Sequence, residues 1–240
     1  PGRIAERAAY RHFLRRLRGA ELVVVPSQET ADDVTGQIGV PRSLLRVVPH
    51  GTPPSALPEG GRPDGPYLLY TGALDPHKNA GLAVDVLAAL PGEVRLVMTG
   101  PWAPRRLVSL RRRAEAMGVA ARIDWRGWQP EGALAALRAG ATAVLIPSRK
   151  EGFGLPVLEA MQAGTPVIAA DVPALRETGG DAAVYCDLGL VGEWAAAVEE
   201  LLADPSRAAT AAAGRRRAAE FTWERTARAL RDVWRETDDS

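Results

Sequence analysis

Two glutamates, Glu151 and Glu159, flank a glycine-containing turn in the segment EGFGLPVLE. Pro156 is well placed to open a helix, because a residue at the first helical position has no N–H partner to lose. The start of such a helix brings the amides of Gly154 and Leu155 to a positive end, which favours an anionic group. We expect Glu151 in the loop and Glu159 in the first helical turn, where one carboxylate meets a sugar and the other a ribose hydroxyl pair. The segment therefore predicts a site for a sugar nucleotide.

A plain helix start is the alternative interpretation of this segment. In that case Glu159 does no more than complement the positive end of the helix dipole. Two glycines, a second glutamate and Phe153, which we expect to be exposed, favour the binding site over this alternative.

The bulk composition limits the class of protein. The chain has 240 residues, of which 46% are hydrophobic and 25% charged, as in an ordinary soluble globular protein. A net charge of +1 gives no reason to expect nucleic acid as a partner. The single cysteine, Cys186, excludes an intrachain disulfide, fits a reducing compartment and has no paired histidine that would predict catalysis. No apolar run approaches the roughly 20 residues that span a bilayer, so we expect a cytoplasmic protein.

Strand and helix patterns alternate from Tyr67 onward. Most of the apolar runs are continuous, as in strands that are covered on both faces. This alternation predicts an α/β fold with a Rossmann-like, doubly wound parallel sheet. The expected strands are Tyr67–Tyr70, Val94–Met98, Arg122–Trp125, Thr142–Ile146, Val167–Ala170 and Ala182–Tyr185.

The carboxyl ends of these strands carry small and polar residues. Ligands of doubly wound sheets bind beyond those ends, and glycine there allows close approach of the backbone. EGFGLP follows the fourth strand, so we expect the candidate residues to converge on one rim of the sheet. The strand ends are Thr71-Gly72, Thr99-Gly100, Arg126-Gly127 and Pro147-Ser148.

The two ends of the chain do not follow this alternation. Residues 1–62 contain only two expected strands, Leu22–Val25 and Leu45–Val48, and finish in a Pro- and Gly-rich linker. Two strands do not make an independent sheet domain, so we expect the closing part of a domain whose beginning is absent. The start PGRIAER, without an initiator Met, suggests a chain that is cut from something longer or processed. The expected domains are 1–62, the ligand-binding domain 63–219 and a final helix in 220–240.

A basic stripe marks the first expected helix. Its arginines at four-residue spacing could dock on anionic lipid, which would make the protein peripheral at the inner membrane face. A solvated helix face is the favoured interpretation, and the membrane surface stays the alternative. The stripe consists of Arg3, Arg7, Arg11 and Arg15.

Several segments together resemble one enzyme family. PSRKEGFGLPVLEAMQAGTPVIAADVPALRETGGDAAVYCD (147–187) closely resembles the donor-binding domain of family 4 retaining glycosyltransferases, which have the two-domain GT-B architecture. YTGALDPHKN (70–79) resembles the first strand and phosphate loop of that domain, and IDWRGWQPEGALAALRAG (123–140) the segment that borders the nucleobase. FTWERTA (221–227) resembles the start of the terminal cross-over helix. Several motifs in the expected order are stronger than a lone match.

The resemblance implies a role for three charged residues. Glu151 would contact the donor sugar near the reacting centre, and Glu159 would bond the ribose hydroxyls. Lys78 would neutralise the charge that develops on the leaving diphosphate, where fixed cations and amides are needed. The alternative for Lys78 is a solvated lysine before a helix cap at Asn79; its place just after a Gly-bearing strand end favours function.

Backbone groups would complete the diphosphate site. The resemblance implies that the amides of Phe153, Gly154 and Leu155 hold the sugar or diphosphate beside Gly72. Many relatives have arginine after that glycine or directly before the lysine, where this chain has Ala73 and His77. His77 would give a weaker, pH-dependent contact or none.

Trp128 and Gln129 flank the expected base position. Trp128 could equally stack on a base or pack within the protein, whereas core packing is favoured for Trp125. The other tryptophans are expected to pack in the core or between helices: Trp102, Trp194, Trp223 and Trp234.

The resemblance thus implies a retaining, metal-independent hexosyltransferase that needs no cofactor beyond its donor. A nucleoside diphosphate sugar would donate to a hydroxyl of a sugar, lipid or natural product. PHKN with EGFGLP is most similar to the mannosyltransferase-like branch, which favours GDP-mannose, with UDP- and dTDP-sugars open. Two alternatives remain: a binding module that needs a partner subunit or an N-terminal half for turnover, and a GT-B nucleotide-sugar epimerase.

Overall fold

The computed structural model describes residues 16–238 except 18, 53–57 and 205–207. The expected basic helix with Arg3, Arg7, Arg11 and Arg15 therefore lies outside the described residues. The chain divides into two compact units. The larger one covers residues 52–220, and the smaller one joins the residues up to 51 with those from 221 onward.

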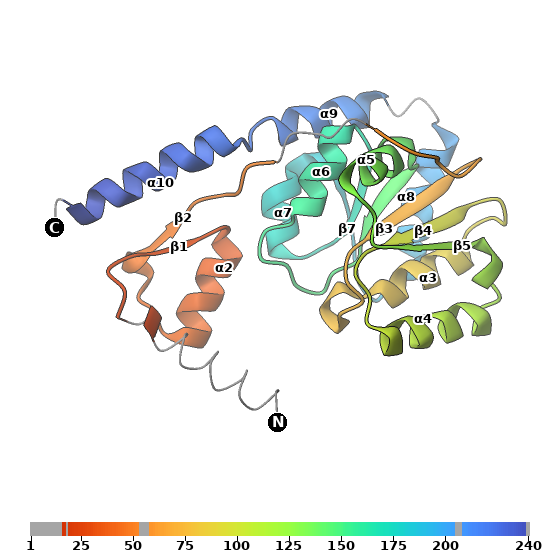
Figure 1. The fold of residues 1–240 in the computed structure, drawn as a ribbon, viewed down its shortest axis with the longest axis horizontal. Helices are drawn as coiled ribbons and strands as arrows, with labels where there is room; N and C mark the ends of the chain where they lie inside the picture. The colour runs from red at the N-terminus through yellow and green to blue at the C-terminus, as the bar shows by residue number, and fades with distance from the viewer. Residues whose placement is uncertain (1–15, 18, 53–57, 205–207, 239–240) are drawn as a thin grey trace. The chain divides into compact units, whose positions relative to one another are not determined.

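A six-stranded parallel sheet forms the centre of the larger unit (Figure 1). Its strand order is β5-β4-β3-β6-β7-β8, with every neighbouring pair parallel. The chain moves outward from β3 and then returns to its other side, so the order reverses between β3 and β6. This is the doubly wound sheet that the sequence predicted, with its switch point between those two strands. The strands are β3 (Tyr67–Thr71), β4 (Arg95–Thr99), β5 (Ile123–Gly127), β6 (Ala143–Ile146), β7 (Val167–Ala170) and β8 (Val184–Cys186).

Helices cover both faces of this sheet. On one face α3 packs with α4 and α8, and on the other α6 packs with α5, α7 and α9 (Figure 1). Strands β6 and β7 are buried along their whole length, which explains their continuous apolar sequences. The helices are α3 (Ala80–Ala89), α4 (Pro104–Ala116), α5 (Glu131–Gly140), α6 (Leu155–Ala163), α7 (Pro173–Gly179), α8 (Val191–Ala203) and α9 (Ala208–Ala218).

The smaller unit contains a short parallel pair of strands, β1 (Val23–Val25) and β2 (Leu45–Val47). Between them α2 (Gln28–Asp33) continues as a π-helical segment, Val34–Ile38. Ser27 caps α2, because its hydroxyl accepts a hydrogen bond of 3.1 Å from the amide of Thr30. Both expected strands are thus present.

Helix α10 (Trp223–Asp238) belongs to the same unit. The Thr226 hydroxyl donates to the carbonyl of Pro49 at 2.7 Å, and Arg46 forms an ion pair of 2.6 Å with Glu236. Thr222 caps the helix, since its hydroxyl accepts from the amide of Arg225 at 3.2 Å.

The tryptophans divide into packed and exposed ones. Trp194 is fully buried in α8, and Trp102 meets Trp125 edge-on at 6.1 Å between ring centroids, as expected for packing residues. The prediction was wrong for Trp234, which is 71% exposed. Trp223 is 46% exposed and meets the His50 ring at 6.2 Å between ring centroids, so it packs on one side only.

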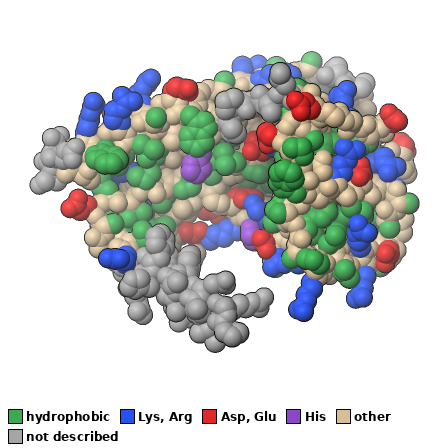
Figure 2. Space-filling model, in the orientation of Figure 1, with side chains coloured by type: hydrophobic (Ala, Val, Ile, Leu, Met, Phe, Trp, Pro, Cys, Tyr) green, Lys and Arg blue, Asp and Glu red, His purple; other side chains and the backbone are tan. Residues whose placement is uncertain are grey.

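The drawn surface carries charges of both signs, and the single cysteine is buried. On the face that Figure 2 draws, acidic and basic side chains are interspersed. Within the described residues no helix is long and apolar enough to cross a membrane. Burial raises the pKa of the Cys186 thiol to about 11, with Glu193 and Asp171 adding to the shift, so it stays protonated at neutral pH.

Candidate functional site

Lys78 and Glu151 meet at the switch point of the large sheet. Lys78 ends a short 3₁₀ turn (Pro76–Lys78) after β3, and Glu151 follows β6. The Lys78 ammonium lies 2.7 and 2.9 Å from the two carboxylate oxygens of Glu151. The Glu151 side chain is 9% exposed and that of Lys78 25%. The structure therefore brings together two residues that are far apart in the sequence, and it offers a cation that an incoming anion can compete for.

The two loops that carry this pair are tied to each other. The amide of Arg149 donates to the carbonyl of His77 at 2.7 Å, and the Arg149 guanidinium donates to the Asn79 side chain at 3.2 Å. Asn79 has a left-handed conformation with φ of 51°, between the 3₁₀ turn and α3. Because the loops are joined on both sides of Lys78, its position relative to Glu151 is fixed by backbone as well as by the ion pair.

Helix α6 begins beside Glu151. Gly154 is its N-cap residue, with no hydrogen bond from a capping side chain, and Leu155 is the first helical residue. The first amides of a helix have no intrahelical acceptor and lie at the positive end of its dipole. This end of α6 can therefore accept anionic groups, as the sequence predicted from Pro156.

Two details of that prediction were wrong. Phe153 is buried, with 5% of its surface exposed, because its ring belongs to the protein interior and its carbonyl accepts from the Thr178 hydroxyl. Glu159 lies in the second turn of α6 instead of the first, because the helix already begins at Leu155. Phe153 can then offer a ligand its backbone but little of its ring.

Glu159 is held by an arginine that the sequence interpretation missed. Arg138 in α5 donates to one oxygen of Glu159 at 2.7 Å and to Glu131 at 2.6 Å. Burial raises the pKa of Glu159, and the neighbouring positive charge of Arg138 opposes that shift while Glu131 adds to it. The sequence held one hint: Arg138 follows Leu137, which was expected to face the core. An arginine that is buried there needs a partner of opposite charge.

The end of β3 approaches the end of β4 closely at Gly72. Its amide donates to the carbonyl of Thr99 at 2.9 Å, and its carbonyl accepts from the Trp102 indole at 3.1 Å. Tyr70 donates to the carbonyl of Ala73 at 2.7 Å. Burial, with the nearby carboxylates of Glu151 and Asp75, raises the pKa of Tyr70, so its hydroxyl remains a hydrogen-bond donor.

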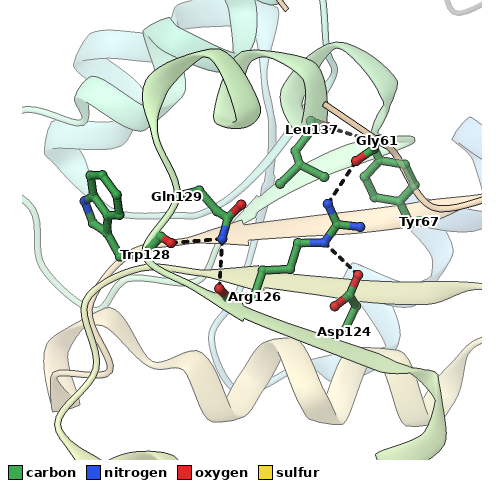
Figure 3. A network of polar contacts seen from close by, with 7 residues as sticks. All are labelled: Gly61, Tyr67, Asp124, Arg126, Trp128, Gln129 and Leu137. Carbon is green, nitrogen blue, oxygen red and sulfur yellow. Dashed lines mark hydrogen bonds and ion pairs between the residues drawn. The ribbon is translucent and has the colours of Figure 1, made fainter. Parts of the chain in front are cut away.

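Trp128 and Gln129 follow β5 at the same rim (Figure 3). The Gln129 amide donates to the carbonyls of Arg126 and Trp128, at 2.9 Å each. Arg126 is itself fixed by Asp124 at 2.7 Å and by the carbonyl of Gly61 at 2.9 Å. The Trp128 carbonyl belongs to this network, but its ring stands apart from it and the residue is 72% exposed, so the ring is available for stacking. Its role at a base stays a prediction.

Two shallow cavities lie near the loop that carries Lys78, with volumes of about 300 and 330 Å³. Asn79, Gly81 and Arg113 line both of them. Neither is lined by Glu151 or Glu159, so they lie to the side of the candidate site on the flank of α3. The convergence of charge at the switch point, and not cavity size, marks the candidate site.

His77 allows a direct test of its expected contribution. Its ring is exposed beside Lys78, and its carbonyl bond to Arg149 would survive substitution. We expect His77→Ala to weaken binding of UDP or GDP by about two- to threefold at pH 6. Isothermal titration at this pH measures the change. Equal affinities of variant and parent at pH 6 would remove His77 from the site.

Comparisons with known proteins show which family the chain resembles. Residues 58–217 match the family model described as "Glycosyl transferases group 1". The chain is 35% identical to a D-inositol 3-phosphate glycosyltransferase of Xylanimonas cellulosilytica, over 90% of this chain and 57% of that protein. It is 36% identical to the O-antigen chain mannosyltransferase B of Escherichia coli, over 66% of this chain and 42% of that one. The chain thus spans about half the length of these curated relatives.

Solved structures show the same fold. A sucrose-phosphate synthase from Thermosynechococcus elongatus superposes with a TM-score of 0.80 at 26% identity, covering 93% of this chain and 60% of that one. Anabaena HepE in complex with UDP and glucose gives a TM-score of 0.77 at 21% identity, covering 96% and 68%. The second likeness concerns the fold alone.

Proposed function

The chain belongs to the group 1 glycosyltransferases, and on this premise we propose that it binds a nucleoside diphosphate sugar at the β3–β6 rim and serves a retaining hexosyl transfer to a hydroxyl acceptor. The observation that carries the proposal is the Lys78–Glu151 pair at the switch point, 2.7 Å apart. Ligands of doubly wound sheets bind at this point.

Charge and hydrogen-bond donors match a diphosphate there. Lys78 supplies a cation, and the N-terminus of α6 at Gly154 and Leu155 supplies backbone amides and the positive end of a dipole. Once the diphosphate takes over Lys78, the Glu151 carboxylate is released to accept hydrogen bonds from the donor sugar. Glu159, 23% exposed along its side chain, can accept from the ribose hydroxyls.

The proposed transfer breaks the bond between the anomeric carbon and the diphosphate oxygen. The acceptor oxygen forms the new glycosidic bond on the same face of the sugar, and its proton passes to the departing diphosphate. Lys78 and the α6 amides stabilise the negative charge that develops on the leaving group, which is the largest task in such a step.

The donor and the acceptor are further parts of the proposal. The resemblance of PHKN and EGFGLP to the mannosyltransferase-like branch, and a curated relative that is a mannosyltransferase, support GDP-mannose. The structure of HepE with UDP and glucose supports trying UDP-glucose beside it. The acceptor would be a hydroxyl of a sugar, lipid or natural product, contacted in part by a domain that resembles the acceptor side of GT-B enzymes. Residues 1–62 would be the closing segment of that domain, and 220–240 its cross-over helix.

Product analysis tests the reaction class. The 240-residue chain is incubated with GDP-mannose or UDP-glucose, with and without simple mannosides, glucosides and myo-inositol as acceptors. We expect release of nucleoside diphosphate and a product with retained anomeric configuration. Because the chain spans 57% of a curated relative, the second candidate is donor binding without turnover, which tight binding without release would favour. An isomeric sugar nucleotide as product would instead identify an epimerase and contradict a transferase.

A further inference from the structure

Arg138 is the most deeply placed charge in the candidate site. Its side chain is 8% exposed, and it contacts the carboxylates of Glu159 in α6 and Glu131 in its own helix. Its carbonyl also accepts from the Thr165 hydroxyl at 2.6 Å. The buried Nε atom has no hydrogen-bond partner among the described residues. Burial of a guanidinium with one unsatisfied N–H is costly, so a gain elsewhere is expected to offset it.

The two carboxylates that share Arg138 differ in their surroundings. Glu131 is 58% exposed along its side chain, so water stabilises its charge. Glu159 is 23% exposed, and burial disfavours its ionised form. Arg138 matters mainly to Glu159, because only there does the guanidinium replace solvation that burial has removed.

The contact is also asymmetric within the Glu159 carboxylate. The Arg138 guanidinium donates to Oε2 at 2.7 Å, whereas Oε1 has no hydrogen bond to any described residue. A carboxylate held by one oxygen has a fixed plane and keeps the other oxygen as an acceptor. This arrangement suits a pair of vicinal hydroxyls, because the remaining lone pairs of an ionised carboxylate can accept from both of them.

We propose that Arg138 is a positioning residue for the nucleotide: it holds Glu159 by one oxygen and in its ionised form, and so leaves the other oxygen to accept the ribose hydroxyls. This inference rests on the proposed function. Arg138 itself lies behind Glu159 and acts through it. A purely structural bridge between α5 and α6 would stabilise the fold but leave nucleotide affinity unchanged in the folded protein.

A double-mutant cycle separates the two roles, with UDP and GDP as probes and calorimetric affinities as the readout. We expect Arg138→Met to weaken binding about tenfold at pH 7.5. The loss should deepen toward pH 6, because without Arg138 the pKa of Glu159 rises further and a larger fraction of this carboxyl is protonated. In a Glu159→Gln background, Arg138→Met should change affinity less than about twofold.

Two control variants fix the interpretation. Arg122→Met removes another partly buried arginine, which donates to the carbonyls of Leu90, Pro91 and Val94 near the amino ends of β4 and β5. It should lower the melting temperature without changing nucleotide affinity. Glu131→Gln removes the charge of the exposed carboxylate that Arg138 also contacts, and it should change nucleotide affinity less than about twofold.

The outcomes distinguish this inference from the proposed function. If the unmutated chain binds neither nucleotide, the proposed function fails and the inference falls with it. If it binds but Arg138→Met binds equally well and with the same pH profile, only the inference is overturned. Should Arg138→Met not fold, NMR of the Arg138 guanidinium in the unmutated chain decides. The Arg138–Glu159 pair should persist when nucleotide binds, and its separation on binding would overturn the inference.

Discussion

Lys78→Met should weaken the binding of a nucleoside diphosphate about a hundredfold, which corresponds to about 2.7 kcal/mol. Two effects add in this variant. The diphosphate loses a charged hydrogen-bond donor, and the Glu151 carboxylate, which Lys78 neutralises at 2.7 Å, is left facing an anion. Titration of UDP and GDP into the variant measures the loss. Transfer, where it is observed, should fall at least as much, because charge on the leaving group grows in the transition state.

Substitution of Glu151, the partner of Lys78, should have the opposite effect on nucleotide binding. Glu151→Gln frees Lys78 from its carboxylate, so the bare nucleoside diphosphate should bind as well as before or more tightly, while turnover is lost. Lys150→Met is the matched control, because it removes an exposed lysine one residue before Glu151 and should change affinity less than about twofold. If Lys78→Met and Glu151→Gln weakened nucleotide binding equally, the pair would be a structural bridge instead of a diphosphate site.

Gly100→Ala should destabilise the larger unit by about 3 kcal/mol, lowering its melting temperature by roughly 6–12 °C. Gly100 has φ of 143°, and a Cβ there would lie 2.1 Å from the carbonyl oxygen of Gly72. That neighbour is backbone at the end of β3, so β3 and β4 must separate to make room. Thermal unfolding followed by circular dichroism measures the change.

The matched control is Gly118→Ala. Gly118 also has a positive φ, 71°, but no described atom lies within 4 Å of its added Cβ. Its substitution should cost only the backbone strain, about 1 kcal/mol. If both variants lost the same stability, the close approach of Gly72 and Gly100 would not constrain this rim.

Most of the fold could be predicted from the sequence, because continuous apolar strands alternate with helical patterns. Strand β7 has the expected bounds, Val167–Ala170, and β3 differs from its prediction only by Thr71. The GT-B resemblance and the parallel order were confirmed together, since the strand order follows from alternation and right-handed crossovers. The failures were local. Apolar residues recur on one face of α10, at Trp223, Leu230 and Trp234, which predicts that this face packs, whereas the structure leaves all three exposed.

The sequence indicated which residues to consider for the candidate site, but not which side chains would contact each other. Residues that follow β3 and β6 converge because those strands are neighbours, which the doubly wound order requires. That Lys78 would reach Glu151, and that Arg138 would reach Glu159 from another helix, depends on side-chain geometry between distant segments. Phe153 was misjudged because a turn of glycines suggested exposure, whereas the adjacent α7 buries its backbone through Thr178.

Thermal stabilisation by nucleotide sugars tests the central claim most directly. The 240-residue chain and its Glu159→Gln variant are unfolded with and without GDP-, UDP-, dTDP- and ADP-sugars. A donor at a hundredfold excess over its dissociation constant should add about 2.7 kcal/mol, a shift of several degrees. We predict that donors with one base stabilise the parent chain and that the variant loses the shift. No stabilisation by any donor, or a shift that Glu159→Gln leaves unchanged, would contradict a nucleotide-sugar site at the β3–β6 rim.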